Sequence, residues 1–399
     1  MSLLIGWIIF VAALLFSIML HELGHFATAK WSGMKVSRFF LGFGNTLWST
    51  QRGETEYGIK SLPVGGFVKI EGMTSLDDVD PADESRSFRS KPAWKRIIVM
   101  AAGSFMHFAL AFFLLIVLAM GVGLVNQNTT TIGTVSTCVP ASARALQSAN
   151  PCSGSHTAAP AQAAGIRSGD KVIAIGGTAV HSWAGLGDAI RAQPNGQPVP
   201  VTVLRDGKQI TLHATPAQIP GRSGSYLGIE AANVFQRLGP LAALSYAANT
   251  FGDVLTGSVT AVGHLPSAIP DLFARDRAQT PAGQVSSVVG VGGITAQVVA
   301  ANDGWQTKVQ LILFIIISLN IFVGAFNLLP LLPLDGGHLA VIFYERIRAW
   351  LARLRGRPDP GLVDMRKLIP VSVGVFALLV GFGLLLITAD IFNPVKFVQ

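Results

Sequence analysis

Residues 3–25 read LLIGWIIFVAALLFSIMLHELGH, and this stretch decides the class of fold. It is apolar from Leu3 to Leu20, close to the roughly 20 residues that a helix needs to cross a bilayer. No Lys or Arg precedes the run and no small-residue cleavage site follows it, which argues against a cleaved signal peptide. The run leads directly into the polar residues 21–25, so we expect a membrane span that is retained.

Three more segments are apolar and long enough to span a membrane, at roughly 97–125, 309–335 and 368–389. The composition agrees, because 50% of the 399 residues are hydrophobic and only 13% are charged. Soluble domains carry a charge on about 25% of their residues. The sequence therefore predicts a polytopic α-helical membrane protein with about four transmembrane helices.

The net charge of +8 is unevenly distributed along the chain. The stretch 30–96 contains 11 Lys and Arg residues and the stretch 345–367 contains seven, whereas the much longer stretch 126–308 contains only 11. Lys and Arg favour the cytoplasmic side of a membrane. We therefore expect the two dense stretches to be cytoplasmic, and 126–308 and both termini to be extracytoplasmic. Membrane topology, and not nucleic-acid binding, accounts for the charge.

The first cytoplasmic stretch contains a predicted β-hairpin at 36–70. Val36–Ser49 and Tyr57–Ile70 are rich in β-branched and aromatic residues, and Gln51–Glu54 lies between them as a turn. Gly65 and Gly66 allow a bend or the close approach of another backbone.

The stretch 126–235 is predicted to be a small β-rich domain with short helices. Asp206-Gly207 is a turn signal between two of its strands. Cys138 and Cys152 lie 14 residues apart and form a disulfide if this stretch faces an oxidising compartment; otherwise they are two unrelated thiols. The expected strands are Thr131–Ser136, Lys171–Ile175, Pro200–Leu204 and Gln209–Ala214, and the expected helices are Ala161–Ala164 and Trp183–Gln193.

These segments together predict four parts of the chain. An N-terminal membrane half (1–125) precedes the extracytoplasmic domain (126–235). Amphipathic connecting helices (236–306) then lead back to a C-terminal membrane half (307–399).

Residues 21–25, His-Glu-Leu-Gly-His, form an HExxH motif. Positions i and i+4 of a helix share one face, so His21 and His25 can reach one metal ion, and Glu22 can take a proton from the attacking water. Zinc with three protein ligands and an open position suits hydrolysis by such a metal-bound water. Ionised groups inside a span cost about 2.5–3.5 kcal/mol each on insertion scales, and a bound cation compensates for them. A polar contact between helices without metal is the alternative.

Asp335 is the candidate for the third metal ligand, because it is the one carboxylate of the predicted third span. His21 lies roughly 27 Å along the first span, and Asp335 lies near the cytoplasmic end of the third, so the two reach a similar depth. A helix cap beside Gly336 and Gly337 is the alternative for Asp335. His338 is a candidate fourth ligand, although its spacing from Asp335 favours a structural role.

A protease that cuts a transmembrane helix must bind its substrate unwound, and the edge of the 36–70 hairpin can receive such an extended segment. Pro330 and Pro333 interrupt the third span and leave backbone polar groups without helical hydrogen bonds. Inside a membrane such unpaired groups are tolerated where they line a polar cavity. The Asn327 amide can hold a substrate backbone there, or equally well join two helices. The candidate substrate-binding residues are Asn327, Pro330, Gly65 and Gly66.

Four stretches resemble the site-2 protease family of intramembrane zinc metalloproteases, and most of all its bacterial regulator-of-sigma-E-protease group, in particular the actinobacterial branch. They are HELGH at 21–25, GMKVSRFFLGFGNTLWS at 33–49, TEYGIKSLPVGGFVKIEGM at 55–73 and NLLPLLPLDGGH at 327–338. A fifth stretch, AGIRSGDKVIAIGGTAV at 164–180, resembles a PDZ domain of the circularly permuted bacterial kind.

The resemblance implies that His21, His25 and Asp335 bind zinc and that Glu22 is the general base. It implies a membrane-reentrant 36–70 hairpin, a bacterial cell membrane, and a PDZ-like domain that admits substrates already trimmed outside. The implied substrates are single-span anti-sigma factors or signal-peptide remnants.

One motif departs from the family. Relatives commonly have Gly-Pro-x-x-Asn on the second span, where this chain has Gly103-Ser104-Phe105-Met106-His107. His107 can donate or accept a hydrogen bond near the site, bind metal in some state, or pack between helices, and packing is favoured.

Three other functions are weighed against proteolysis of such substrates. A non-proteolytic PDZ-bearing membrane chaperone or scaffold would be favoured by loss of HExxH or Asp335, and both are present. A metal transporter needs several intramembrane ligands along a path, whereas this chain has one compact set. A protease for a developmental precursor is the third.

Overall fold

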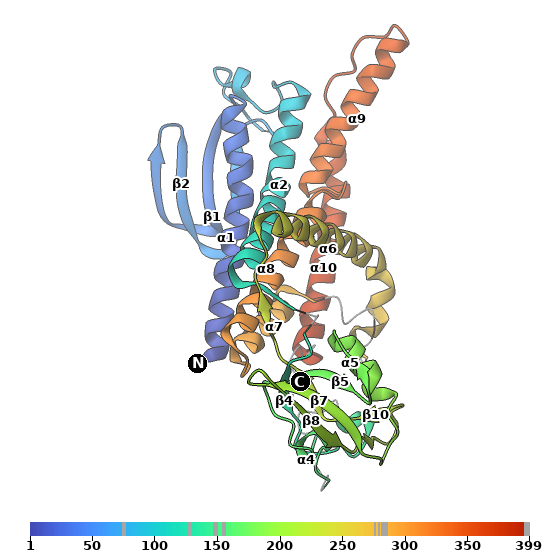
Figure 1. The fold of residues 1–399 in the computed structure, drawn as a ribbon. Coiled ribbons are helices and arrows are strands. Elements are labelled where there is room, and N and C mark those ends of the chain that lie inside the picture. Colours follow the sequence, from blue (N-terminus) through green and yellow to red (C-terminus); the bar gives the residue numbers. More distant parts are fainter. Residues whose placement is uncertain are drawn as a thin grey trace. The chain divides into compact units, whose positions relative to one another are not determined.

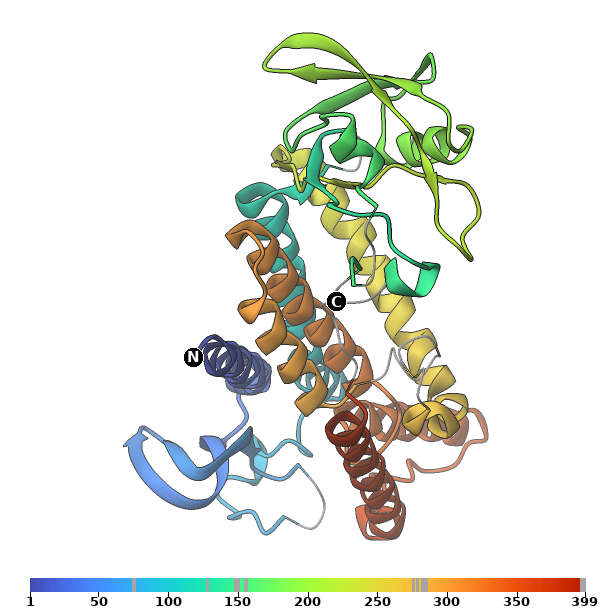
Figure 2. The same cartoon turned by 90° about the horizontal axis from the view of Figure 1, so that it is seen from below.

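The computed structural model describes residues 1–73, 77–126, 129–146, 151–153, 157–274, 277, 280 and 286–394. The chain forms two compact units. One contains Met1–Ala119 together with the chain from Gly239 onward, and the other contains Met120–Leu238. Figures 1 and 2 show the elements of each unit.

Within the described residues, four helices of the first unit are long and apolar enough to cross a membrane, which confirms the predicted number of spans. Helices α1, α2 and α8 pack side by side (Figure 2). Helix α10 exposes most of its apolar surface, and its buried residues are Leu386, Ala389 and Asp390. Such a surface is stable in lipid and not in water. The four are α1 (Ser2–Trp31), α2 (Ala93–Val117, continued by the π-helical η2, Leu118–Val122), α8 (Trp305–Asn327) and α10 (Ile369–Phe392, preceded by the 3-10 turn η6, Met365–Leu368).

The end of the third span differs from the prediction. Helix α8 ends at Asn327, and after a turn a separate helix, α9 (Asp335–Leu354), begins. Pro330 and Pro333 lie in this turn, which confirms the predicted interruption of the helix, because proline has no N–H to continue the helical hydrogen bonds. The prediction that Asp335 belongs to the third span is therefore wrong, because Asp335 is the first residue of α9.

The predicted hairpin is confirmed as two long strands, β1 (Val36–Arg52) and β2 (Thr55–Ile70), which lie beside α1 in Figure 1. The strands bend, so that Arg38–Leu41 of β1 pairs with β2 on both sides. Phe39 is paired with both Val68 and Tyr57, and Leu41 with both Gly66 and Ile59. The segment 66–70 is thereby placed at the edge of this small sheet. The 3-10 turn η1 (Glu84–Arg86) follows before α2.

The second unit is built around a four-stranded sheet in the order β6-β5-β7-β8. Its core contains fully buried aliphatic side chains of β5 and β7, packed against Leu186 of helix α5. Arg205 binds the buried Asp170 through two hydrogen bonds of 2.7 Å, which hold the pKa of that carboxyl below its usual range. The sheet strands are β5 (Lys171–Ile175), β6 (Thr178–Ala179), β7 (Val199–Arg205) and β8 (Lys208–Ala214), and the main helix is α5 (Trp183–Arg191).

Short elements complete this unit, and the expected elements appear within two residues of their predicted bounds. The sulfur atoms of Cys138 and Cys152 are joined in a disulfide. The strand pairs are β3 (Leu124–Val125) with β12 (Phe235–Gln236), β4 (Ile132–Val135) with β11 (Ile229–Ala231), and β9 (Ala217–Gln218) with β10 (Ser225–Tyr226); the short helices are α3 (Ala143–Leu146) and α4 (Pro160–Ala163).

Two helices connect this unit to the third span. Helix α6 (Pro240–Ala268) packs on α2 through Phe251, whose ring lies against Phe108 and Phe112, and the 3-10 turn η3 (Ile269–Phe273) follows it. Helix α7 (Val288–Ala300) packs against α1. Contrary to the prediction of amphipathic helices, α7 is largely apolar, with Thr295 and Gln297 as its polar side chains, and it packs against the apolar helices α1, α8 and α10.

Candidate metal centre

Helix α1 places His21 and His25 on one face, one helical turn apart. Both side chains are buried, with 8% and 4% of their surfaces exposed, and their ring centroids are 4.7 Å apart. The two Nε2 atoms face each other at 3.1 Å. The HExxH spacing thus produces the geometry that the sequence predicts.

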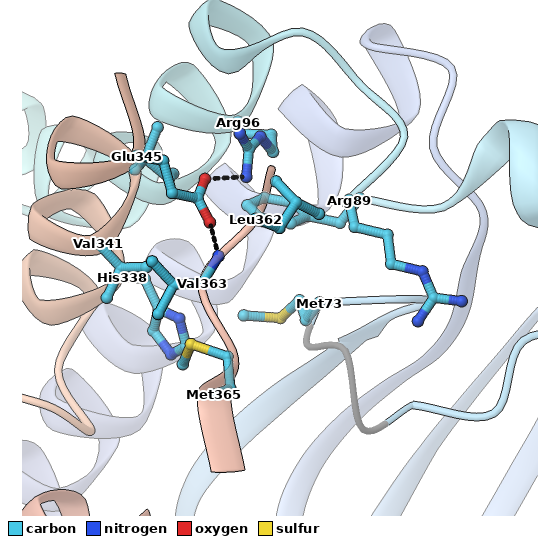
Figure 3. A pocket seen from close by; sticks show the side chains of 11 residues that line it. Met73, Arg89, Arg96, His338, Val341, Glu345, Leu362, Val363 and Met365 are labelled. Atoms are coloured by element: carbon cyan, nitrogen blue, oxygen red, sulfur yellow. Dashed lines mark hydrogen bonds and ion pairs between the residues drawn. The ribbon is translucent and has the colours of Figure 1, made fainter. Parts of the chain in front are cut away.

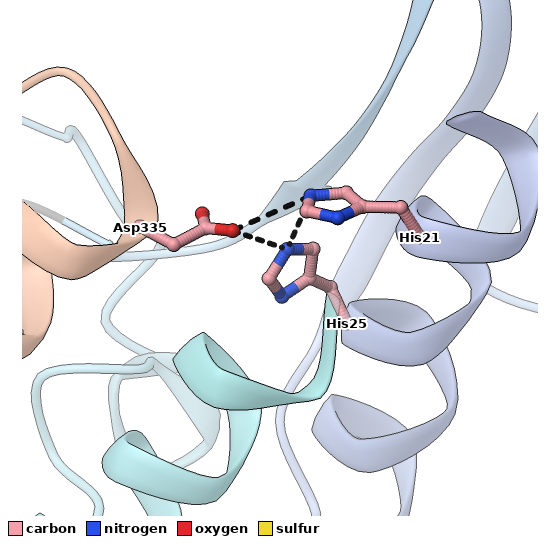
Figure 4. A group of neighbouring side chains, drawn as sticks. All are labelled: His21, His25 and Asp335. Atoms are coloured by element: carbon pink, nitrogen blue, oxygen red, sulfur yellow. Dashed lines mark hydrogen bonds and ion pairs between the residues drawn. The ribbon is translucent and has the colours of Figure 1, made fainter. Parts of the chain in front are cut away.

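The third side chain comes from the start of α9, more than 300 positions along the chain. Asp335 Oδ2 lies 3.3 Å from Nε2 of His21 and 3.3 Å from Nε2 of His25 (Figure 4). Within the described part of the chain, these three residues form the one group of His, Cys, Asp or Glu whose ligand atoms all lie within 4.8 Å of one another.

The donor atoms of this group fit a divalent cation. Asp335 Oδ2 is buried and accepts no hydrogen bond from any described residue. His25 donates its Nδ1–H to the Val99 carbonyl oxygen over 2.7 Å, so its Nε2 presents a lone pair toward the other two ligand atoms. Converging lone pairs repel one another unless a cation lies between them. Two imidazoles and one carboxylate match the three protein ligands found in one class of catalytic zinc site.

Helix α2 supplies two contacts that the sequence analysis missed. Val99 fixes the ring of His25, and Gly103 leaves room for both rings, because a Cβ atom there would lie 2.4 Å from His21 Cε1 and from His25 Nε2. A glycine inside an apolar span was the one available signal, since glycine disfavours helix and is kept where another group approaches closely.

Glu22 lies beside the edge of the hairpin. A Cβ atom on Gly66 would be 3.3 Å from Glu22 Cγ and 3.2 Å from Met19 Sδ, so β2 passes directly over this face of α1. Gly65 turns away from it, toward the ring of Phe43. Of the two predicted glycines, the structure therefore brings Gly66 to the site.

Asn327 and Pro330 lie at the end of α8 and in the following turn. Asn327 is partly exposed, and its amide has no hydrogen-bond partner within the described ranges, while Pro330 is exposed. Both belong to the connection between α8 and α9, which ends at Asp335.

His107 of α2 lies next to His21, with ring centroids 5.0 Å apart, but it is not one of the clustered ligands. Its Nδ1 is 2.8 Å from Oδ1 of Asn320 on α8. Of the three roles left open for His107, the hydrogen bond near the site is the one observed. Asn320, 1% exposed, was not predicted as a site residue, because one Asn in an apolar span has no distinguishing pattern.

His338 is likewise outside the ligand group and lines a cavity of about 40 Å³ (Figure 3). In the same cavity, Arg96 Nη1 of α2 binds Glu345 Oε2 of α9 over 3.0 Å, and Glu345 Oε1 accepts the Val363 N–H over 2.9 Å. This buried ion pair joins α9, which begins with Asp335, to α2, whose Val99 carbonyl accepts the hydrogen bond from His25.

Comparison with known proteins agrees with this geometry. A sequence model of peptidase family M50 matches residues 9–357. The zinc metalloprotease Rip1 of Mycobacterium tuberculosis is 36% identical over 409 residues, covering 99% of each chain, and that of Mycolicibacterium smegmatis is 36% identical over 419 residues with the same coverage. The metalloprotease MmpA of Caulobacter vibrioides is 29% identical over 384 residues, covering 86% of this chain and 88% of its own.

Proposed function

Because the chain belongs to peptidase family M50, the site-2 proteases, and is a zinc metalloprotease of the membrane, we propose that it cuts single-span membrane proteins within or near the bilayer. The observation that carries the proposal is the meeting of His21, His25 and Asp335 beside Glu22, on a helix apolar enough to span a membrane. In this proposal the three clustered residues hold the zinc ion.

Glu22 is the proposed general base. Zinc, when bound, supplies a Lewis acid that makes a water molecule nucleophilic near neutral pH. The Glu22 carboxylate takes the proton from the attacking water and then donates it to the nitrogen of the leaving amine, so that one carboxylate serves both halves of the hydrolysis. Its position beside the ligands in sequence and beside Gly66 in space supports this role.

The hairpin edge is the proposed substrate clamp. The segment 66–70 lies at the edge of its sheet and next to Glu22, so an extended substrate segment can add to it as a further strand. Side chains of the hairpin that are exposed and apolar support its insertion into lipid: Phe43, Leu47, Trp48, Ile59 and Leu62. Asn327 and Pro330 face the substrate from the α8–α9 connection in this proposal.

The second unit is the proposed PDZ-like filter, on the extracytoplasmic side with both chain termini. A cavity of about 160 Å³ lies between α5 and β10–β11, lined by Leu186, Ile190 and Tyr226 among others. A groove between a helix and a short strand suits an extended peptide. The disulfide supports an oxidising compartment for this unit. Anti-sigma factors and signal-peptide remnants, already trimmed outside, are the proposed substrates.

The Glu22→Gln variant tests the proposal. Purified wild type should cleave candidate single-span proteins, and the variant, equal in folding and zinc content, should not. The two samples are compared by cleavage in the same membranes and by metal analysis. Full cleavage by Glu22→Gln would refute the mechanism, and absence of cleavage by wild type would favour the alternative of a PDZ-bearing chaperone or scaffold.

A further inference from the structure

The buried amide of Asn320 has a defined orientation. Its Nδ2 donates to the Ile316 carbonyl oxygen over 2.8 Å and to Ser17 Oγ over 3.1 Å. A carbonyl oxygen only accepts, so the nitrogen of the amide must face Ile316. Oδ1 of Asn320 therefore faces His107.

This orientation fixes the tautomer of His107. Asn320 Oδ1 is an acceptor, so the 2.8 Å contact requires a proton on Nδ1 of His107. In the neutral imidazole the other ring nitrogen, Nε2, then carries an unprotonated lone pair. His107 is 4% exposed, and the centroid of its ring lies 5.0 Å from that of His21.

His21 has the complementary requirement. Its Nε2 belongs to the ligand cluster, so the proton of the neutral ring must be on Nδ1. This Nδ1 is buried and has no hydrogen-bond partner within the described residues. Histidines that bind a metal almost always donate the second ring N–H to an acceptor, which orients the ring and makes the ligand more basic.

We propose that His107 is a positioning residue for the zinc ligand His21, whose Nδ1–H is accepted by the Nε2 lone pair of His107 when zinc is bound. The proposal rests on the proposed zinc-ligand role of His21. Hydrogen bonds join Ser17 on α1 to Asn320 on α8 and Asn320 to His107 on α2, and the proposed bond from His21 would return this chain to α1. This chain locks the relative positions of three apolar helices around the ion.

A second acceptor competes for the same proton. Ser104 Oγ is also buried without a partner among the described atoms, and it follows Gly103, whose Cβ position lies 2.7 Å from His21 Nδ1. Among the described residues, no hydrogen bond fixes the orientation of the Ser104 hydroxyl. The orientation of the His107 ring is fixed by its hydrogen bond to Asn320. Ser104→Ala is therefore the matched control for the proposal.

The test is the rate at which zinc passes from the purified full-length protein to a chromophoric chelator. We expect His107→Phe, which keeps a ring but removes both nitrogens, to release zinc about ten- to a hundredfold faster than wild type. His107→Gln, which keeps a donor and an acceptor, should remain within about threefold, the order of change left when the hydrogen bonds survive. Asn320→Ala should lie between these two, and Ser104→Ala should match wild type.

Zinc release from His107→Phe at the wild-type rate would overturn the proposal. Equally fast zinc release from His107→Phe and His107→Gln would also overturn it, because packing alone would then explain the effect. A faster release from Ser104→Ala than from Asn320→Ala would assign the proton to Ser104 instead. If His107→Phe does not fold, the comparison of Asn320→Ala with Ser104→Ala decides. Since no cleavage is measured, failure here is separate from failure of the proposed protease function.

Discussion

Three ionisable side chains on one turn of an apolar helix would be costly in a membrane without a partner. His21, Glu22 and His25 are such a group, and Asp335 brings a carboxylate to the two histidines at 3.3 Å. Groups of this kind within membrane spans are retained where they form a functional site. A divalent ion among these ligands offsets the cost, so metal binding and local stability should change together.

Gly103 sets the space that the two histidine rings occupy. We expect Gly103→Ala to lower the zinc affinity at least about tenfold, because the new Cβ would overlap His21 Cε1 and His25 Nε2, and a helix backbone cannot easily retreat. Titration with zinc in the presence of a competing chelator measures the affinity. Gly121→Ala is the matched control, since a Cβ on Gly121 meets no described atom within 4 Å. A Gly103→Ala protein with unchanged zinc affinity would show that the rings sit elsewhere.

At the scale of whole elements, the position of Asp335, the proposed third zinc ligand, depends on how α9 is held. Asp335 begins α9, and Glu345 lies further along the same helix, bound to Arg96 of α2 and to the backbone of Val363. Both residues are buried, with 7% of Glu345 and 8% of Arg96 exposed. The pair is therefore suited to fix α9 against α2, which also holds His25 through Val99.

Breaking this ion pair should affect both stability and the metal site. We expect Glu345→Ala to cost roughly 3 kcal/mol of unfolding free energy, because Arg96 would remain buried without its counter-charge, and to weaken zinc binding through the displaced Asp335. Thermal unfolding and chelator competition measure the two effects. The pair Arg38–Glu56, whose side chains are 55% and 33% exposed, is the control, and Glu56→Ala should cost less than about 1 kcal/mol. Equal effects of the two variants would exclude a special role for the buried pair.

A substitution at the edge of the hairpin should lower cleavage without changing zinc binding, unlike the two substitutions above. Gly66→Asp places a charge where the clamped substrate would lie, beside Glu22 but away from the ligands, so cleavage should fall at least about tenfold while zinc content stays constant. Gly53→Asp, at the open turn of the same hairpin, should leave both unchanged. Cleavage by Gly66→Asp at the wild-type rate would count against the clamp.

At the scale of the molecule, hydropathy and residue type predicted the spans, the hairpin and the three clustered residues, because each has a periodic or local signature. The interruption at Pro330 and Pro333 was predicted, but the end of α8 at Asn327 was missed, since apolar residues continue through Leu328–Leu334 and only the two prolines indicate the turn. The apolar helix α7 was missed because it is too short to register as a span. Asn320 and His107 depend on contacts between distant helices, which no local pattern predicts.

In the proposed site, one zinc ion is held by ligands from two distant parts of the membrane unit. X-ray absorption at the zinc edge of the purified protein tests it most directly. We predict a shell of nitrogen and oxygen at about 2.0–2.2 Å with scattering from two imidazoles, no sulfur at about 2.3 Å, and a loss of zinc affinity in Asp335→Ala. A third imidazole, a sulfur ligand, or full zinc affinity in Asp335→Ala would contradict the account.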